Sequence, residues 1–244
     1  EETLPAAVAG LKTCGIRGFN LTMPNKNKIV ELLDELSPEA QLIGAVNTVL
    51  NDNGKLIGYN TDGYGFMQSV RDAGHDITGK NITVMGVGGA SMAICAQSAL
   101  DGAASVHIFA RRTSRYWNRT QKFAENLSAK TGCQVCLFDN DDHTALRDSI
   151  AQSYLLINAT SVGMVPDIDD TIIKDTSLFH PELVVADVVY EPQETRLLRE
   201  AKAAGCQTFN GMYMLLHQGA KAFQIWTGQE MPVSVIKEKY FSVK

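Results

Sequence analysis

The amino-acid sequence predicts an α/β protein built around a doubly wound parallel sheet that is covered by helices. Two observations support this fold class. Through the middle of the chain, short β-rich segments alternate with longer segments of helical periodicity, which is the arrangement that builds such a sheet. The chain has 244 residues, of which 45% are hydrophobic. That is enough for one or two domains with a substantial core.

The doubly wound part is expected from about residue 62 to residue 210. Its strands are expected at residues 81–86, 105–110, 134–138, 155–159 and 183–189. Between them, residues 92–100 and 119–130 have the composition and spacing of helices. Because each strand is followed by a helical segment, neighbouring strands are expected to run parallel.

The ends of the chain predict a second α/β piece. Residues 28–36 have the periodicity of a helix, and residues 44–50 and 55–59 are expected to form two strands around a turn at residues 51–54. Near the other end, residues 212–227 are expected to form a helix that Gly228 ends.

Charge and composition argue against several classes of function. The chain carries 22 basic and 27 acidic residues, a net charge of -5, and has no dense run of Lys and Arg. Nucleic acid and anionic membranes are therefore poor candidates as partners. No apolar stretch approaches the length of a membrane span, and the first ten residues have no basic segment before an apolar block.

The cysteines favour a reducing, cytoplasmic compartment, because their number is odd and their spacing is irregular. Cys133 and Cys136 form a CxxC pair, but no second Cys or His pair follows at the spacing of zinc ligands. We therefore expect these two residues to pack in the core, and we expect no metal site.

A glycine-rich turn, GVGGAS, follows the first strand of the doubly wound part. It begins at Gly86 and contains Gly88, Gly89 and Ala90. Glycines let the backbone turn tightly and approach a pyrophosphate, while the next helix points its free N–H groups at the phosphates. With a strand before it and a helix after it, the turn predicts dinucleotide binding. The alternative is a purely structural tight turn.

The second strand of this part bears on which dinucleotide binds. An NAD site usually has a carboxylate at the end of this strand, where it accepts hydrogen bonds from the ribose. Here the strand runs into Arg111, Arg112 and Arg115, with no acid among them. Guanidinium groups suit a 2′-phosphate, so the sequence favours NADP, with NAD still possible. The alternative is an ordinary solvated basic loop.

Polar residues also cluster in the first sixty residues, in the segments NLTMPNK, GAVNT and GYNTDG. Two of these segments place Asn, Thr or Asp at the ends of expected strands. In open α/β sheets ligands bind beyond the carboxyl ends of strands, so these side chains are expected to converge on one cleft. A Lys near an Asp is, by itself, more often a surface ion pair than a catalytic one.

The chain resembles the shikimate and quinate/shikimate dehydrogenases. The segments NLTMPNK, GAVNT, YNTDGYG, GVGGAS, NATSVGM, DVVYEPQET and NGMYMLLHQGAKAF occur in the same order as in that family. The resemblance implies a Rossmann-like dinucleotide domain (62–210) that faces a discontinuous substrate-binding domain (1–61 and 211–244) across a cleft. It also implies reversible reduction of 3-dehydroshikimate to shikimate with NADPH, a reaction of aromatic amino acid biosynthesis.

The same resemblance implies roles for individual residues. Lys26 matches the catalytic lysine of the family, and Asp62 matches its partner aspartate. Positions that bind the polyhydroxy ring are Thr22, Asn47, Tyr190 and Gln218. Positions that bind the cofactor are Gly88, Gly89, Ala90, Arg111, Arg112, Arg115, Val188 and Gly211. Reduction builds negative charge on the ketone oxygen, which a lysine ammonium can stabilise and protonate.

Some features depart from the family pattern. The family opens with a strand and a serine-rich loop that binds the substrate carboxylate, and no such segment precedes Glu1. We therefore expect a substrate-binding domain that is incomplete at its N-terminus. Tyr213 replaces a glycine close to the nicotinamide, where it either narrows the cleft or packs within the last helix.

Two alternatives remain open beside the NADP-linked enzyme. They are a quinate/shikimate dehydrogenase that uses NAD, and a non-catalytic paralogue that binds a dinucleotide. As an enzyme, the protein is expected to act on a small molecule as a monomer or a homodimer.

Overall fold

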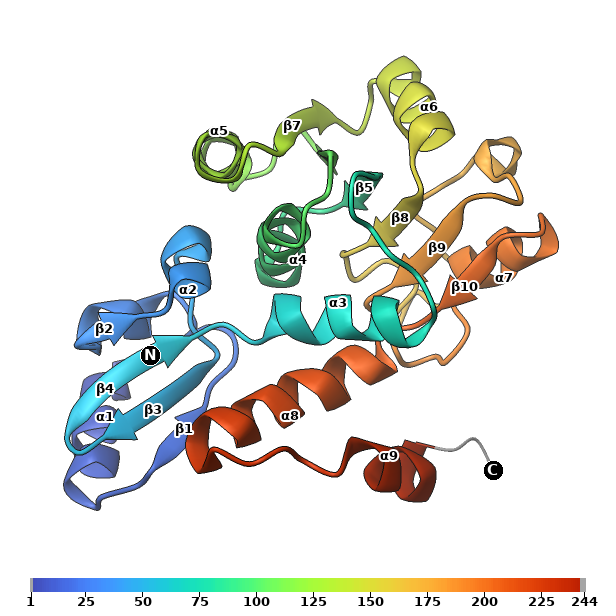
Figure 1. The fold of residues 1–244 in the computed structure, drawn as a ribbon. Coiled ribbons are helices and arrows are strands. Elements are labelled where there is room, and N and C mark those ends of the chain that lie inside the picture. The colour runs from blue at the N-terminus through green and yellow to red at the C-terminus, as the bar shows by residue number, and fades with distance from the viewer. Residues whose placement is uncertain (1, 242–244) are drawn as a thin grey trace.

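The computed structural model describes residues 2–241, and within them two β-sheets lie on either side of a pair of packed helices (Figure 1). The larger sheet has six strands and the smaller has four. The two helices between them are α3 (Asp62–Asp72) and α8 (Met212–Thr227). The predicted α/β class with a doubly wound sheet is thus confirmed.

The larger sheet is parallel throughout. In order across the sheet, its strands are β10 (Gln207–Phe209), β9 (Val184–Asp187), β8 (Leu155–Asn158), β5 (Asn81–Met85), β6 (Ser105–Ala110) and β7 (Gln134–Asp139). The chain starts in the middle at β5, winds outward to β7, and returns to wind the other way from β8. The switch in direction lies between β5 and β8, and ligands of such sheets bind at the carboxyl ends of the strands there.

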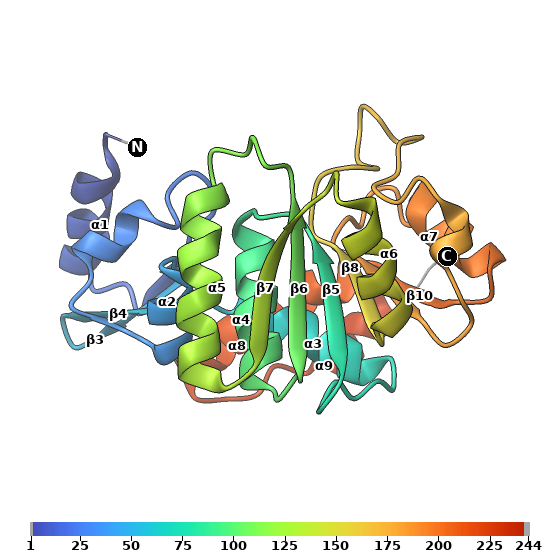
Figure 2. The ribbon, with the colours of Figure 1, turned by 90° about the horizontal axis from the view of Figure 1, so that it is seen from above.

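Helices cover both faces of this sheet (Figure 2). On one face, α4 (Gly89–Leu100), α5 (Trp117–Thr131) and α3 pack on one core cluster. On the other face, α6 (His143–Gln152) and α7 (Arg196–Ala203) pack on a second cluster. Alternate strand residues separate the two clusters, since Leu155 and Ile157 belong to the first and Leu156 to the second. The continuous apolar strands are therefore buried on both faces.

The smaller sheet is mixed and carries its own core. Its strands, in spatial order, are β1 (Gly18–Asn20), β3 (Thr48–Asp52), β4 (Lys55–Tyr59) and β2 (Glu35–Leu36). The helical elements near it are α1 (Leu4–Thr13), η1 (Lys28–Leu32) and α2 (Pro38–Ile43). A third cluster that includes Val8, Ile29 and Val49 fills the space between them. The hairpin turn expected at residues 51–54 is present, with Asn53 and Gly54 at positive φ.

Two expectations for this region were wrong. Residues 28–36 do not form one helix, because the short 3-10 helix η1 ends at Leu32 and β2 follows it. Asp34 there exchanges hydrogen bonds with Leu56 of β4: its backbone N–H donates to Leu56, and its carboxylate accepts the N–H of Leu56. These hydrogen bonds to the sheet favour an extended conformation after Leu32, although the sequence there has the periodicity of a helix. The strand expected from residue 44 begins at Thr48, since Gly44 adopts a left-handed conformation that ends α2.

The other expected elements are present, with ends shifted by a few residues. Helix α8 has the expected bounds, and Gly228 ends it at a φ of 72°. The elements that the sequence did not predict are α1, β1, α2, α3, α6, α7 and β10. The sequence also did not predict η2 (Thr176–Leu178), α9 (Val233–Ile236) or η3 (Lys237–Phe241).

Helices α3 and α8 pack closely and connect the two sheets. A Cβ atom on Gly65 of α3 would lie 2.6 Å from the carbonyl oxygen of Met214 and 2.7 Å from the backbone nitrogen of Gln218, so only glycine permits this approach. At the far end of α8, the indole N–H of Trp226 donates to the carbonyl of Val49 in β3. Helix α3 belongs to the core of the larger sheet, through residues such as Phe66.

Cys133 is buried in the core, and this burial raises the pKa of its thiol to about 11. Cys136 is half-buried. Within residues 2–241, no cluster of His, Cys, Asp or Glu has the arrangement of a metal site. None of the helices in the same part of the chain combines the length and the apolar composition that crossing a membrane requires.

Candidate active site

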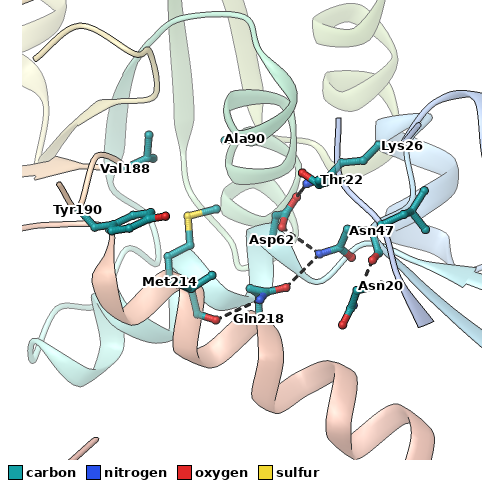
Figure 3. A pocket seen from close by; sticks show the side chains of 13 residues that line it. Asn20, Thr22, Lys26, Asn47, Asp62, Ala90, Val188, Tyr190, Met214 and Gln218 are labelled. Carbon is teal, nitrogen blue, oxygen red and sulfur yellow. Dashed lines mark hydrogen bonds and ion pairs between the residues drawn. The ribbon is translucent and has the colours of Figure 1, made fainter. Parts of the chain in front are cut away.

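A cavity of about 480 Å³ lies between the smaller sheet, helix α8 and the carboxyl ends of the larger sheet (Figure 3). The expected catalytic and substrate-binding residues all line it: Thr22, Lys26, Asn47, Asp62, Tyr190 and Gln218. Three of the expected cofactor residues line it as well: Ala90, Val188 and Gly211. These residues come from positions as far apart as 22 and 218, and the fold brings them together around one space.

Lys26 and Asp62 form an ion pair in the wall of this cavity. The Nζ atom of Lys26 lies 2.6 Å from Oδ2 of Asp62, and the side chains are only 15% and 11% exposed. Lys26 lies in the loop after β1, and Asp62 is the first residue of α3. The partial burial distinguishes this pair from a solvated surface ion pair, which contributes little to stability.

Asn47 connects this ion pair to helix α8. Its Nδ2 atom donates to Oδ1 of Asp62 at 2.9 Å and lies 3.4 Å from Oε1 of Gln218. Each carboxylate oxygen of Asp62 therefore has a donor, one from Asn47 and one from Lys26. Asn47 is buried, so the arrangement is held away from bulk water on this side.

Antiparallel pairing explains why these side chains converge. Asn20 at the end of β1 pairs with Thr48 at the start of β3, and Thr48 pairs with Tyr59 at the end of β4. We expected polar residues at the carboxyl ends of strands. Asn47 instead precedes β3, and it reaches Asp62 because the start of β3 lies beside the end of β4.

The opposite wall of the cavity comes from the larger sheet. Val188 and Tyr190 follow β9, and a Cβ atom on Gly211 would lie 2.1 Å from the carbonyl oxygen of Val188. Asp187, at the end of β9, holds this loop: it is fully buried and accepts hydrogen bonds from Asn158 Nδ2 and the backbone N–H of Val189. Burial raises the pKa of the Asp187 carboxyl above its ordinary value, although these donors oppose the shift.

The glycine-rich turn lies next to the same cavity. Gly86 has a φ of 110°, a conformation that favours glycine, and Gly88 caps α4. A second cavity of about 470 Å³ is lined by Gly88, Gly89 and Ala90, and it shares Ala90, Val188 and Tyr190 with the first. No atom lies within 4 Å of a Cβ built on Gly88 or Gly89, so their backbone is open to a ligand. This open turn at a helix N-terminus fits the pyrophosphate of a dinucleotide.

A third cavity of about 550 Å³ brings Lys26 and the glycine turn together. It is lined by Lys26 on one side and by Gly88, Gly89 and Tyr116 on the other. The catalytic lysine implied by the family resemblance therefore lies within reach of the dinucleotide turn.

The three arginines after β6 lie on the surface, outside these cavities. Arg112 stacks on the indole of Trp117 with its guanidinium carbon 4.6 Å from the ring centroid, and Arg115 lies 4.7 Å from the ring of Tyr116. Of these two aromatic residues, Tyr116 also lines the third cavity together with Gly88 and Gly89. The carboxylate of Asp139, at the end of the neighbouring strand β7, accepts the backbone N–H of Arg112 at 3.3 Å. The three exposed guanidinium groups still suit a 2′-phosphate.

Some residues of the site were not predicted. Asn20, Leu21, Met214 and Leu215 also line the first cavity. Met214 lies one helical turn before Gln218 in α8, so both residues lie on the same face of the helix. This spacing could have predicted that Met214 lines the cavity. Tyr213 lies outside the first cavity and packs near Phe241 and Lys237, so it packs at the last helix and does not narrow the cleft.

Comparison with known proteins agrees with this geometry. Residues 1–49 match the family described as shikimate dehydrogenase substrate binding domain, and residues 211–239 match the shikimate 5′-dehydrogenase C-terminal domain. The chain is 50% identical over 241 residues to the shikimate dehydrogenase (NADP(+)) of Listeria innocua, an alignment that spans 99% of this chain and 82% of that protein. The chain belongs to the shikimate dehydrogenase family.

Two further members of the shikimate dehydrogenase family show how close the likeness is. The crystal structure of shikimate 5-dehydrogenase from Listeria monocytogenes in complex with shikimate and NAD superposes with a TM-score of 0.95 at 50% identity, covering 98% of this chain and 82% of that one. The quinate/shikimate dehydrogenase of Escherichia coli is 42% identical over 238 residues, covering 98% of this chain and 82% of that protein.

Proposed function

We propose that the protein is an NADP-linked shikimate dehydrogenase that reversibly reduces 3-dehydroshikimate to shikimate. The observation that carries this proposal is the cavity in which Lys26 and Asp62 face the glycine turn and the loop after β9. A substrate there lies between a polar wall with a lysine and an open dinucleotide turn. The relatives with this activity are similar over nearly the whole chain.

The residues of the cavity can perform the parts of the reaction that the protein must supply. Bound NADPH supplies a hydride. As the ketone oxygen gains negative charge, the Lys26 ammonium stabilises it and can donate the proton. Asp62 holds the ammonium in place and can accept a hydrogen bond from a substrate hydroxyl. Asn47 and Gln218 offer amide groups to the other hydroxyls of the ring.

The cofactor roles assigned to Gly86, Gly88, Gly89 and the three arginines are part of this proposal. The open backbone of the turn supports a pyrophosphate, and the basic edge after β6 supports NADP over NAD. NAD remains a possible cofactor, since a family member with 50% identity has been crystallised with it. The identity of 42% to a quinate/shikimate dehydrogenase keeps quinate with NAD as the second candidate.

Finer assignments also belong to the proposal. We divide the chain into a substrate-binding domain (1–61 and 211–244) and a dinucleotide domain (62–210), with helices α3 and α8 at the boundary. The packing of α3 in the core of the larger sheet supports placing it with the dinucleotide domain. We further propose a cytoplasmic location and a monomer or homodimer.

The test follows nicotinamide absorbance while the purified protein is offered shikimate or quinate, each with NADP or NAD. Reduction of NADP with shikimate at the highest kcat/KM supports the proposal. The highest value for quinate with NAD would shift the assignment to the second candidate. Binding of NADP without turnover of any pair would indicate a non-catalytic paralogue.

Two variants extend this test to the cofactor. Arg111→Leu should lower kcat/KM for NADP about tenfold and leave that for NAD within about twofold, because a hydrogen bond between charged groups is lost. Arg147→Leu is the matched control, since this exposed arginine lies on α6 on the other face of the sheet. Equal losses with NADP and NAD would contradict the role of Arg111.

A further inference from the structure

We propose that Thr48 is a positioning residue for this reaction, because its buried hydroxyl orients the amide of Asn47 and thereby the carboxylate of Asp62. The inference rests on the proposed function. Thr48 is fully buried and does not line the cavity, whereas Asn47 and Asp62 do. Its role is therefore indirect.

The hydroxyl of Thr48 lies in a chain of hydrogen bonds with a defined direction. It accepts from Nδ2 of Asn20 at 2.9 Å and donates to Oδ1 of Asn47 at 3.0 Å. A hydroxyl has one hydrogen, and the amide nitrogen of Asn20 can only donate. Two acceptors are within reach of the Thr48 hydrogen, and Oδ1 of Asn47 at 3.0 Å is closer than Oγ1 of Thr61 at 3.4 Å. We therefore assign this hydrogen to Asn47.

This contact helps to select one of the two amide orientations of Asn47. Its Oδ1 atom also accepts the backbone N–H of Thr61 at 2.9 Å, and its Nδ2 atom donates to Asp62 at 2.9 Å. A flipped amide would direct N–H groups at the N–H of Thr61 and the hydroxyl of Thr48, and an oxygen at the carboxylate of Asp62. Because Thr48 adds a second donor on the oxygen side, it disfavours that orientation.

The orientation of Asn47 determines what Asp62 can do. One oxygen of Asp62 is held by Asn47 and the other by Lys26. Figure 3 shows Asn47 between Asp62 and Gln218, with its amide directed at both. A misplaced amide would release Asp62 on the Asn47 side, and the position of the Lys26 ammonium against the ketone would change with it.

Replacement of Thr48 by Val tests this role, because Val keeps the shape and removes the hydroxyl. We expect Thr48→Val to lower kcat/KM for shikimate about tenfold, the loss expected for one buried hydrogen bond, and to leave KM for NADP within about twofold. Thr48→Ser keeps the hydroxyl and should restore kcat/KM to within about threefold of the wild type. A purely structural role would not separate the substrate from the cofactor in this way.

Thr83→Val is the matched control. Thr83 is also a fully buried strand threonine, and its hydroxyl pairs with Ser153 at 2.7 Å in the larger sheet, away from the cavity. Both Val variants should lose similar thermal stability, but only Thr48→Val should lose kcat/KM. Equal kinetics in the two variants, or no rescue by Thr48→Ser, would overturn the role of Thr48.

Calorimetric titration with shikimate separates this result from the proposed function. The wild type is expected to bind shikimate, and Thr48→Val to bind it about tenfold more weakly, whether or not turnover is measured. Normal turnover and binding in Thr48→Val would overturn the role of Thr48 alone. A wild type that neither binds nor oxidises shikimate would overturn the proposed function and the role of Thr48 with it.

Discussion

Replacement of Lys26 by Met should reduce turnover far more than it reduces substrate affinity. Met keeps most of the length of the side chain and removes the ammonium. The ammonium lies 2.6 Å from Asp62 in a wall where both side chains are largely buried, so its removal leaves the Asp62 carboxylate without its charged partner. The ketone carries no full charge before the hydride arrives, and the interaction that is lost is therefore strongest in the transition state.

The size of the effect follows from the role of the ammonium. Removal of a group that stabilises a developing oxyanion lowers kcat by about 10² to 10³, and loss of general acid catalysis lowers it by about 10² to 10⁴. One ammonium supplies both effects, so they do not multiply. We expect kcat to fall about 10³-fold, which corresponds to about 4 kcal/mol of barrier. KM for shikimate should change less than about fivefold.

Steady-state kinetics with shikimate and NADP would measure both parameters. Lys55→Met is the control, because Lys55 forms an ion pair with Glu35 on the smaller sheet, with the side chains 54% and 53% exposed. It should leave kcat within about twofold and the stability nearly unchanged, because exposed ion pairs contribute little. A Lys26→Met protein with unchanged kcat and a raised KM would refute the reasoning, because the ammonium would then bind ground state and transition state equally.

Two further predictions concern stability. Gly65→Ala should lower the free energy of unfolding by about 1 to 3 kcal/mol and reduce activity, because its Cβ would overlap the backbone of α8. Gly219→Ala, at a position of α8 with no atom near its Cβ, should be neutral or stabilising in the same urea titration. Equal losses would contradict the close approach of the helices. The pKa of Asp187 is raised by burial, so its contribution to stability is fully present below about pH 3.9 and is lost as pH rises through the folded-state pKa. Asp187→Asn removes this titration, so the Tm of the wild type relative to the variant should fall as the pH rises above about 4. A Tm difference independent of pH would argue against a raised pKa.

Much of the larger sheet could be predicted from the sequence, because central strands such as β8 and β9 are buried on both faces and are therefore continuous apolar runs. The glycine turn after β5 was found for a similar reason, since glycine is the residue that such a turn requires at Gly86. Helix α8 and its end at Gly228 were predicted because periodicity and the capping glycine agree. These are features that a short segment of sequence determines by itself.

The smaller sheet was harder to predict. Residues 28–36 have helical periodicity, but hydrogen bonds between Asp34 and β4 place part of them at a sheet edge. The short strand β1 has too few residues for a pattern to emerge. In this region, pairing with distant strands decides the local structure, and no window of sequence contains the partner.

The sequence by itself determined the types of residue in the site, since the family motifs name Lys26, Asp62, Asn47 and Gln218. Only the tertiary structure decided their contacts. The antiparallel pairing of β1, β3 and β4 brings Asn47 to Asp62, and the close packing of α3 on α8 brings Gln218 to Asn47. The contacts of Thr48 with Asn20 and Asn47 likewise depend on the tertiary structure. A hydrogen bond requires a certain distance and direction in space, and the spacing of residues in the sequence specifies neither for separate strands.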